Sequence, residues 1–294
     1  AAASLTFSLA AMPEAGDEFV VVAPYFPEYR VFIERAGGKV VEAKAAADFH
    51  LDLAALDRAI GARTKAVILN SPNNPTGAVY GRAELQALAA LLKKKSAEKG
   101  APVYLIADEP YRELTYGAEV ACLLNLYPHT VLCYSFSKSL SLAGERIGYI
   151  AVPDGCFDAD GLFAAVCGAG RALGYVCAPA LFQRVCAKCL GKSGDIAAYR
   201  ENRDLLWNAL RKYGFGCVPP EGAFYLFVRS PEPDAKAFCE RAKKYELLLV
   251  PSDSFGVEGY VRISYCVAKE TIVNALPAFQ KLAEEYGLQQ TEQE

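Results

Sequence analysis

Apolar and polar positions follow two periods along the first half of the chain. Short runs of β-branched and other apolar residues are separated by stretches with helical spacing, such as Ala83–Lys99, which is followed by Gly100. The runs that predict strands are Glu18–Ala23, Lys39–Glu42, Lys65–Asn70, Val103–Ala107, Val131–Phe136 and Ile147–Val152. Strands that alternate with helices favour an α/β fold, in which helices cover both faces of a mostly parallel sheet.

The second half of the chain has a different pattern. A long charged helix is predicted at Ile196–Tyr213, and short strand-like runs with flanking helices follow it. These segments are, in order, Gly222–Val228, Ala235–Tyr245, Leu247–Pro251, Tyr260–Tyr265 and Lys269–Tyr286. Their order is typical of a smaller α+β domain. We therefore predict a large domain over residues 1–195 and a small C-terminal domain over residues 196–294.

The composition is that of a globular protein and excludes several other classes. Of the 294 residues, 53% are hydrophobic and 22% are charged, and the formal net charge is −3. The basic run Lys93–Lys95 lies in a predicted helix, so we expect no nucleic-acid partner. No apolar stretch reaches about 18 residues, so we expect no membrane span. The first residues also lack the positively charged segment of a signal peptide.

The ten cysteines favour a reducing compartment. Disulfide frameworks belong to short secreted domains, and this chain is long, so we expect a cytoplasmic protein. Cys186 and Cys189 have the spacing of a metal or redox pair, but no second pair with matching spacing follows them. In a helix, the same spacing places two small apolar residues one turn apart. We expect that second arrangement, and no metal site.

Polar segments follow three of the predicted strands directly. They are Asn73–Gly77, Asp108–Tyr111 and Ser135–Lys138. In open α/β sheets, ligands bind at the carboxyl ends of the strands. We therefore expect the three segments to meet at one edge of one sheet and to form a single site.

Lys138 is the first candidate for chemistry at this edge. Lysine is rarely buried unless it is paired or uncharged, and an amine with a lowered pKa can condense with a carbonyl group. Ser135, Ser137 and Arg146 lie close to it in sequence and can bind an anion. Pyridoxal 5′-phosphate (PLP) carries both an aldehyde and a phosphate. The alternative is an ordinary Ser/Lys loop between a strand and the next element.

Asp108 is the second candidate, because a carboxylate at the end of an apolar strand must be paired or solvated. It can pair with a protonated pyridine nitrogen, or it can cap a following helix. Tyr111 and Asn74 can both donate a hydrogen bond to the phenolate oxygen of the same ring. Phe26 can cover the ring face, or it can anchor an exposed loop.

Five segments in this order resemble a known family. They are Ala23-Pro-Tyr-Phe-Pro27, Asn73-Asn-Pro-Thr-Gly77, Ala107-Asp-Glu-Pro-Tyr111, Ser135-Phe-Ser-Lys138 with Gly144-x-Arg146-x-Gly148-Tyr149, and Tyr260-Val-Arg262-Ile-Ser264. Together they resemble the class I/II aminotransferases, the aspartate-aminotransferase-like enzymes of PLP fold type I. The resemblance covers nearly the whole chain, and it implies a PLP-binding large domain.

The resemblance implies a role for each residue at the cofactor ring. Lys138 forms a Schiff base with PLP and later moves the α-proton of the substrate. Asp108 pairs with the pyridine nitrogen, and Tyr111 and Asn74 bind the phenolate oxygen. Phe26 takes the ring-stacking place.

At the phosphate, the resemblance implies Ser135 and Arg146, with Ser137 as a helper. Ala1 and Ala2 are similar to the N-terminus of the helix whose free backbone N–H groups bind the phosphate in this family. Family members usually begin well upstream of this point. We therefore expect the chain to lack an N-terminal arm, part of the small domain and the first part of the large domain.

The resemblance also places the substrate. Arg262 matches the arginine that binds the α-carboxylate as a bidentate fork, next to Asn74. A surface arginine on a strand is the alternative. The implied reaction moves an amino group from an α-amino acid to a 2-oxo acid, in amino-acid metabolism and biosynthesis, in a homodimer. Two alternatives remain, a PLP-dependent C–S β-lyase acting on cystathionine or cysteine, and a PLP-binding regulatory module without turnover.

Overall fold

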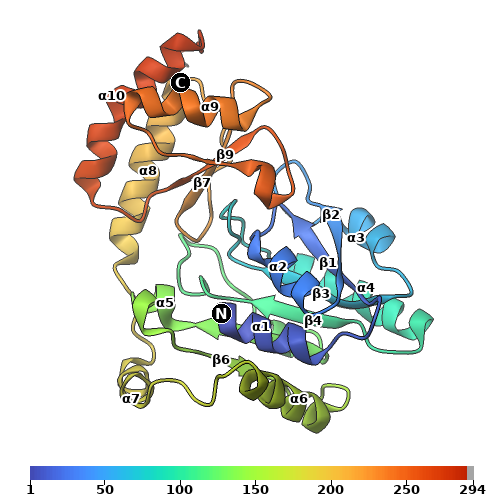
Figure 1. Ribbon diagram of the computed structural model, residues 1–294. Coiled ribbons are helices and arrows are strands. Elements are labelled where there is room, and N and C mark those ends of the chain that lie inside the picture. The colour runs from blue at the N-terminus through green and yellow to red at the C-terminus, as the bar shows by residue number, and fades with distance from the viewer. Residues whose placement is uncertain (290–294) are drawn as a thin grey trace.

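A six-stranded sheet forms the centre of the computed structural model, which describes residues 1–289 (Figure 1). The strand order is β2-β1-β3-β4-β5-β6, and only β6 runs antiparallel to its neighbour. The strands are β1 (Glu18–Ala23), β2 (Lys39–Lys44), β3 (Thr64–Asn70), β4 (Tyr104–Asp108), β5 (Thr130–Ser135) and β6 (Gly148–Ala151). The predicted α/β class with a mostly parallel sheet is confirmed. Residues 290–294 of the predicted small domain lie outside the described range.

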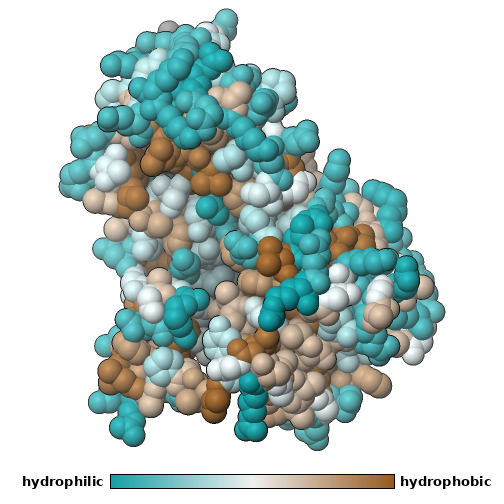
Figure 2. Space-filling view, in the orientation of Figure 1, coloured by the Kyte–Doolittle hydropathy of each residue, from teal (hydrophilic) through white to brown (hydrophobic). Residues whose placement is uncertain are grey.

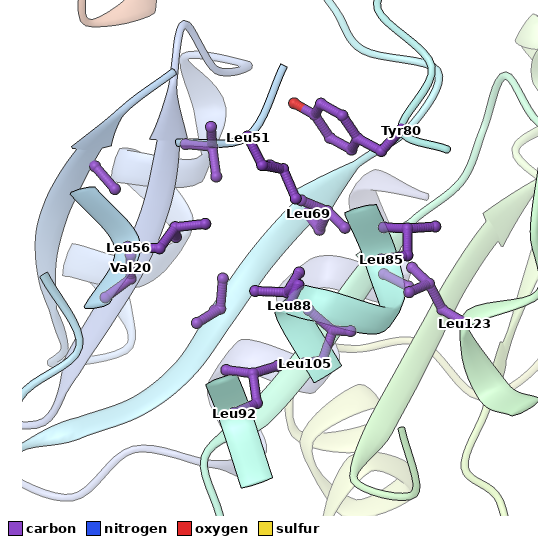
Figure 3. Packing of buried hydrophobic residues seen from close by; sticks show 14 of the residues in the cluster. Val20, Leu51, Leu56, Leu69, Tyr80, Leu85, Leu88, Leu92, Leu105 and Leu123 are labelled. Carbon is purple, nitrogen blue, oxygen red and sulfur yellow. The ribbon is translucent and has the colours of Figure 1, made fainter. Parts of the chain in front are cut away.

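Helices cover both faces of this sheet, because nearly every residue of its inner strands is buried. The helices of this part of the chain are α1 (Ala2–Ala11), α2 (Glu28–Arg35), α3 (Leu53–Ala59), α4 (Arg82–Lys99), α5 (Phe136–Ser139), α6 (Ala159–Ala172) and α7 (Ala180–Cys189). Along β1, Val20 and Val22 belong to a buried cluster with α3 and α4, which Figure 3 shows. Phe19 and Val21 belong to a separate cluster with α1, α2 and α6. The period of two in a strand therefore supplies two hydrophobic layers.

The C-terminal part of the chain forms a second, antiparallel sheet with the order β7-β9-β8 (Figure 1). Its elements are α8 (Ile196–Lys212), β7 (Tyr225–Arg229), α9 (Ala235–Ala242), β8 (Val250–Pro251), β9 (Tyr260–Ser264) and α10 (Lys269–Glu285). Short 3₁₀ helices lie at Leu123–Asn125, Ala143–Glu145, Lys243–Tyr245 and Ser252–Phe255. A further hydrophobic cluster holds this part together and also includes Tyr111 and Leu114; within it, Leu210, Phe238 and Leu282 are at or below 1% exposure.

The loop after β3 joins the two sheets. The carbonyl of Gly77 accepts hydrogen bonds from the backbone N–H groups of Glu221 and Gly222, each at 2.9 Å. Gly77 has a φ of +76°, and a Cβ at this position would lie 2.3 Å from the Cβ of Pro220. Only glycine suits such a backbone at such a close contact. The Asn73–Gly77 loop is therefore fixed against the segment that precedes β7.

The surface is polar at the outer end of the C-terminal part and more apolar lower on the same face (Figure 2). Leu181 on α7 and Leu190 just after it are 67% and 68% exposed. Within residues 1–289, every helix is either too short or too polar to cross a membrane.

Candidate active site

The carboxyl ends of β3 and β4 are tied together by one amide side chain. Asn70, the last residue of β3, donates a hydrogen bond from Nδ2 to the carbonyl of Asp108 at 2.8 Å. Its Oδ1 accepts from the backbone N–H of Asn74 at 2.7 Å. The end of β4 is tied to β5 in turn, because the N–H of Glu109 donates to the carbonyl of Cys133 at 3.0 Å. The three polar segments therefore lie along one edge of the sheet, as the strand pattern predicts.

Asp108 has a buried carboxyl group with one oxygen free. The residue is 4% exposed, and its Oδ2 accepts a hydrogen bond from the hydroxyl of Tyr29 at 2.5 Å. Within the described residues, its Oδ1 is buried without a hydrogen-bond partner. Burial raises the pKa of Asp108 to about 6, although the Tyr29 hydrogen bond acts in the opposite direction. The alternative that Asp108 caps a following helix is wrong, because the residues after it form a turn and no helix begins there.

Tyr29 is a partner of Asp108 that sequence reasoning missed. It lies on α2 and is 1% exposed, and burial together with the charge of Asp108 raises its pKa well above 10. Phe26, which is partly buried, packs edge-on against Tyr29 with ring centroids 5.6 Å apart. The signal that could have found it is the aromatic segment Tyr25–Tyr29, which follows β1 at the same sheet edge and contains three aromatic residues.

Lys138 extends from α5, the single helical turn that follows β5. Its Nζ lies 5.3 Å from the ring centroid of Phe224, and no carboxylate of the described residues forms an ion pair with it. Burial lowers the pKa of its ammonium group; the thiol of Cys266 acts against this, whereas Arg146 and Arg262 lower the pKa further. The structure thus gives Lys138 the surroundings of a readily deprotonated amine.

Hydroxyl groups and a guanidinium lie next to Lys138. The hydroxyl of Ser135 donates to that of Ser137 at 2.8 Å, and Ser135 also caps α5 by accepting from the Ser137 N–H at 3.1 Å. Arg146, which is exposed, donates from Nη1 to the carbonyl of Ala143 at 2.7 Å and to Ser137 Oγ at 3.5 Å. These donors form a cluster that suits an anion.

The start of α1 faces the same cluster. Ala1 is the N-cap residue and Ala2 is the first helical residue. Helix α1 packs against β5, the strand that leads into α5. The N-terminus of a helix attracts anions through its free N–H groups and its dipole.

Arg262 comes from the second sheet and reaches the first. It lies on β9, is partly buried, and donates from Nη1 to Asn74 Oδ1 at 2.9 Å. Its guanidinium carbon lies 4.5 Å from the ring centroid of Tyr225 and 5.1 Å from that of Phe255. The alternative of a surface arginine is therefore wrong.

Tyr111 lies between the two sheets in the same region. It is 5% exposed, and its hydroxyl oxygen is 3.2 Å from that of Tyr225. Burial raises the pKa of Tyr111 well above 10; Tyr225 and Asp108 raise it as well, and Arg262 acts against them. Tyr111 is therefore a neutral hydroxyl donor at physiological pH.

The cysteine pair lies elsewhere. Cys186 is buried and Cys189 is partly buried on α7, and both are free thiols, like the other eight cysteines. Across residues 1–289, no group of three or more His, Cys, Asp or Glu side chains could hold a metal ion.

Comparisons with known proteins give matches along most of the chain. The family model "Aminotransferase class I and II" matches residues 1–279. An aspartate aminotransferase of Thermotoga maritima is 33% identical over 274 residues, which cover 90% of this chain and 69% of that protein. An aspartate/prephenate aminotransferase of Thermus thermophilus is 33% identical over 279 residues, with coverage of 92% and 71%. The crystal structure of an amino transferase from Eubacterium rectale superposes with a TM-score of 0.94 at 53% identity, and the match covers 97% of this chain and 72% of that one.

Proposed function

Since this chain belongs to the class I and II aminotransferases, which are PLP-dependent enzymes, we propose that it moves an amino group from an α-amino acid to a 2-oxo acid through Lys138. The observation that carries the proposal is that three suitable groups meet at one edge of the sheet. Lys138 has a lowered pKa at the sheet edge where Asp108 leaves a buried oxygen unpartnered, and Arg262 reaches that edge from the second sheet. The three groups suit an aldehyde, a protonated pyridine and a carboxylate.

The residues at this edge fit PLP. The free Oδ1 of Asp108 matches a ligand that brings an N–H donor into a buried place, and the Ser/Arg cluster matches its phosphate. The residues that would hold PLP are Asp108 at the pyridine nitrogen, Tyr111 and Asn74 at the phenolate oxygen, Ser135, Ser137, Arg146, Ala1 and Ala2 at the phosphate, and Phe26 on the ring face. When bound, PLP accepts the electron pair that remains after the substrate loses its α-proton.

Lys138 has two tasks in this proposal. Its amine would hold the cofactor at the aldehyde carbon, and as a free amine it would serve as general base for the α-proton of the substrate. A general base must be neutral before it can accept a proton. Burial of Lys138, together with the charges of Arg146 and Arg262, lowers its pKa and so raises the fraction of free amine at neutral pH.

Arg262 orients the substrate. The guanidinium presents a planar fork of N–H donors that matches a carboxylate, which lysine cannot reproduce. The hydrogen bond to Asn74 and the rings of Tyr225 and Phe255 hold this fork in one orientation. Binding of the α-carboxylate there fixes the substrate relative to Lys138, and such positioning contributes much of the rate enhancement in enzymes.

We also propose a cytoplasmic homodimer as the active form. Phe163 on α6 and Leu181 on α7 are 59% and 67% exposed, and apolar residues of this kind are common where subunits meet. The free thiols suit a reducing compartment. Sedimentation of the purified protein tests the oligomeric state.

The test of the proposed function is a spectrum followed by an assay. Purified protein with PLP should show the absorbance of bound cofactor, and amino donors with 2-oxoglutarate should convert it and yield glutamate. Lys138→Ala should reduce turnover by at least about 10³-fold, because it removes both the covalent link and the base. The exposed Lys94→Ala serves as the matched control, with unchanged turnover expected. Full activity of Lys138→Ala would refute the proposal, and release of pyruvate from cysteine or cystathionine without transfer would replace it with a C–S β-lyase.

A further inference from the structure

Tyr225, the first residue of β7, links two residues of the proposed site. It is 8% exposed, its hydroxyl oxygen is 3.2 Å from that of Tyr111, and its ring lies 4.5 Å from the guanidinium carbon of Arg262. We propose that Tyr225 is a positioning residue that directs the hydroxyl proton of Tyr111 toward the cofactor and transmits the charge of Arg262 to it. The inference rests on the proposed function, because it takes Tyr111 as a donor to PLP.

The hydrogen bond between the two phenols has only two possible directions. Each hydroxyl carries one proton, so one of the two must donate and the other must accept. If Tyr111 donated to Tyr225, its proton would be used inside the protein. If Tyr225 donates to Tyr111, the proton of Tyr111 remains available for an acceptor in the site.

Electrostatics selects the second direction. The positive charge of Arg262 lies over the ring of Tyr225, whereas no cation of the described residues lies over the ring of Tyr111. A nearby cation makes a phenol more acidic, and the more acidic phenol is the better donor. Burial raises the pKa of both tyrosines and Arg262 lowers both, but the charge of Asp108 raises the pKa of Tyr111 alone, which leaves Tyr225 as the better donor.

The same geometry makes Tyr111 sensitive to the substrate site. A carboxylate bound at Arg262 neutralises part of the charge over Tyr225, which weakens Tyr225 as a donor and so weakens Tyr111 as a donor. Arg262 also bonds Asn74 directly at 2.9 Å. The arginine therefore reaches both residues expected at the phenolate oxygen, one directly and one through Tyr225. Occupation of the carboxylate site is then sensed at the cofactor ring.

Tyr225→Phe tests this, because it removes the hydroxyl and keeps the ring beneath Arg262. Without the Tyr225 hydroxyl, Tyr111 should be a weaker donor to bound PLP. The proton affinity of bound PLP should then rise about five- to tenfold, the size expected for one hydrogen bond. The readout is the midpoint of the absorbance change of bound PLP with pH, which should move to higher pH. Saturating succinate, a carboxylate that cannot react, should move the midpoint of the unsubstituted protein more than that of the variant.

Two further variants make the test specific. If Tyr225 acts through Tyr111, then Tyr225→Phe should have no further effect on the midpoint in a Tyr111→Phe background. Tyr199→Phe is the matched control, since Tyr199 packs against Phe224 in the same aromatic group with ring centroids 5.9 Å apart, and the midpoint should not move. A thermal unfolding midpoint within about 4 °C of the unsubstituted protein shows that the fold of Tyr225→Phe is kept.

The outcomes are separable. An unshifted midpoint in Tyr225→Phe, or the same shift with and without the Tyr111 hydroxyl, would overturn the inference while PLP binding and turnover of the unsubstituted protein remain normal. Failure of the unsubstituted protein to bind PLP at all would instead overturn the proposed function, and this inference with it.

Discussion

The two ends of the proposed cofactor site are built in opposite ways. At one end, Asp108 closes an interior strand and bonds Tyr29 from α2, and both side chains are at most 4% exposed. At the other end, Ser137 is partly buried and Arg146 is exposed, and their donors contact each other and the carbonyl of Ala143. The first end is fixed by the core of the protein, and the second lies in contact with solvent.

This difference indicates where binding energy for PLP should arise. Burial raises the pKa of Asp108 to about 6, so the protein holds a carboxylate whose charged form lacks a full partner. A cationic N–H donor relieves that cost when it binds. Arg146 is hydrated before a phosphate arrives, and solvent screens the pair afterwards. We therefore expect the buried end to dominate affinity and the exposed end to supply a smaller, salt-dependent part.

The largest expected effect is that of Asp108→Asn on PLP affinity. Removing one partner of a buried charge pair costs about 3–5 kcal/mol, which corresponds to affinity weakened by at least about 10²-fold. Equilibrium binding of PLP, followed by fluorescence quenching, measures the loss. The exposed Asp154→Asn serves as control, with unchanged affinity. A dissociation constant for Asp108→Asn within threefold of the control would reverse the ranking of the two ends.

The same substitution should stabilise the protein when PLP is absent. The pKa of Asp108 is about 6 in the fold, against 3.8 for the free side chain, so the folded state retains the proton longer than the unfolded state. The stability that this proton contributes is complete below about pH 4 and is lost as pH rises through about 6. At pH 8, PLP-free Asp108→Asn should therefore be up to about 3 kcal/mol more stable than the unsubstituted protein. Urea unfolding at pH 4 and pH 8 checks this, and equal stability at pH 8 would contradict it.

Tyr29→Phe should have an intermediate effect. A hydrogen bond to a charged group contributes about 1.5–3 kcal/mol, so loss of the Tyr29 hydroxyl should weaken PLP binding about 10- to 100-fold. The neighbouring Tyr25→Phe is the matched control, because that hydroxyl bonds Glu42, away from Asp108. If both variants bound PLP equally well, Tyr29 would have no part in orienting Asp108.

Arg146→Gln should have the smallest effect, at most about tenfold on PLP affinity, since an exposed ion pair contributes about 1 kcal/mol or less. What distinguishes Arg146→Gln from the other variants is how its PLP affinity changes with salt concentration. Affinity of the unsubstituted protein should fall between 0.05 and 0.5 M salt, values at which screening changes strongly, and that of Arg146→Gln should fall less. Parallel salt profiles for the two proteins would show that the exposed end is not held by this charge.

The sequence predicts those parts of the fold that local pattern decides. The continuous apolar run of β1 predicts a buried strand, and Gly100, whose φ is 71°, predicts the end of α4. The predicted strand Leu247–Pro251 is the exception, since only Val250 and Pro251 pair with β9. Proline has no N–H for a ladder, and Leu247 turns into the core instead.

The candidate site likewise contains residues that the local sequence predicts and residues that it does not. Asp108 and Lys138 follow apolar strands directly, so their positions at the sheet edge can be predicted from the chain. The partners of Tyr29 and Tyr225 cannot be predicted in this way, because they lie 79 and 114 positions away, although the aromatic segment after β1 does place Tyr29 near the same edge. Whether Tyr29 and Tyr225 reach these partners depends on how α2 and β7 pack. No local sequence pattern indicates that packing.

The hydrogen bond between Asn74 and Arg262 joins residues that are 188 positions apart. Contacts across such long separations close late in folding, because the entropy of the intervening chain must be lost first. Asn74, Asp108 and Lys138 all precede Arg262 in the sequence, so they are synthesised before it. We therefore expect that the residues proposed to hold PLP can pack together before Arg262 joins them. Binding of a carboxylate at Arg262 would therefore report that the two sheets have come together.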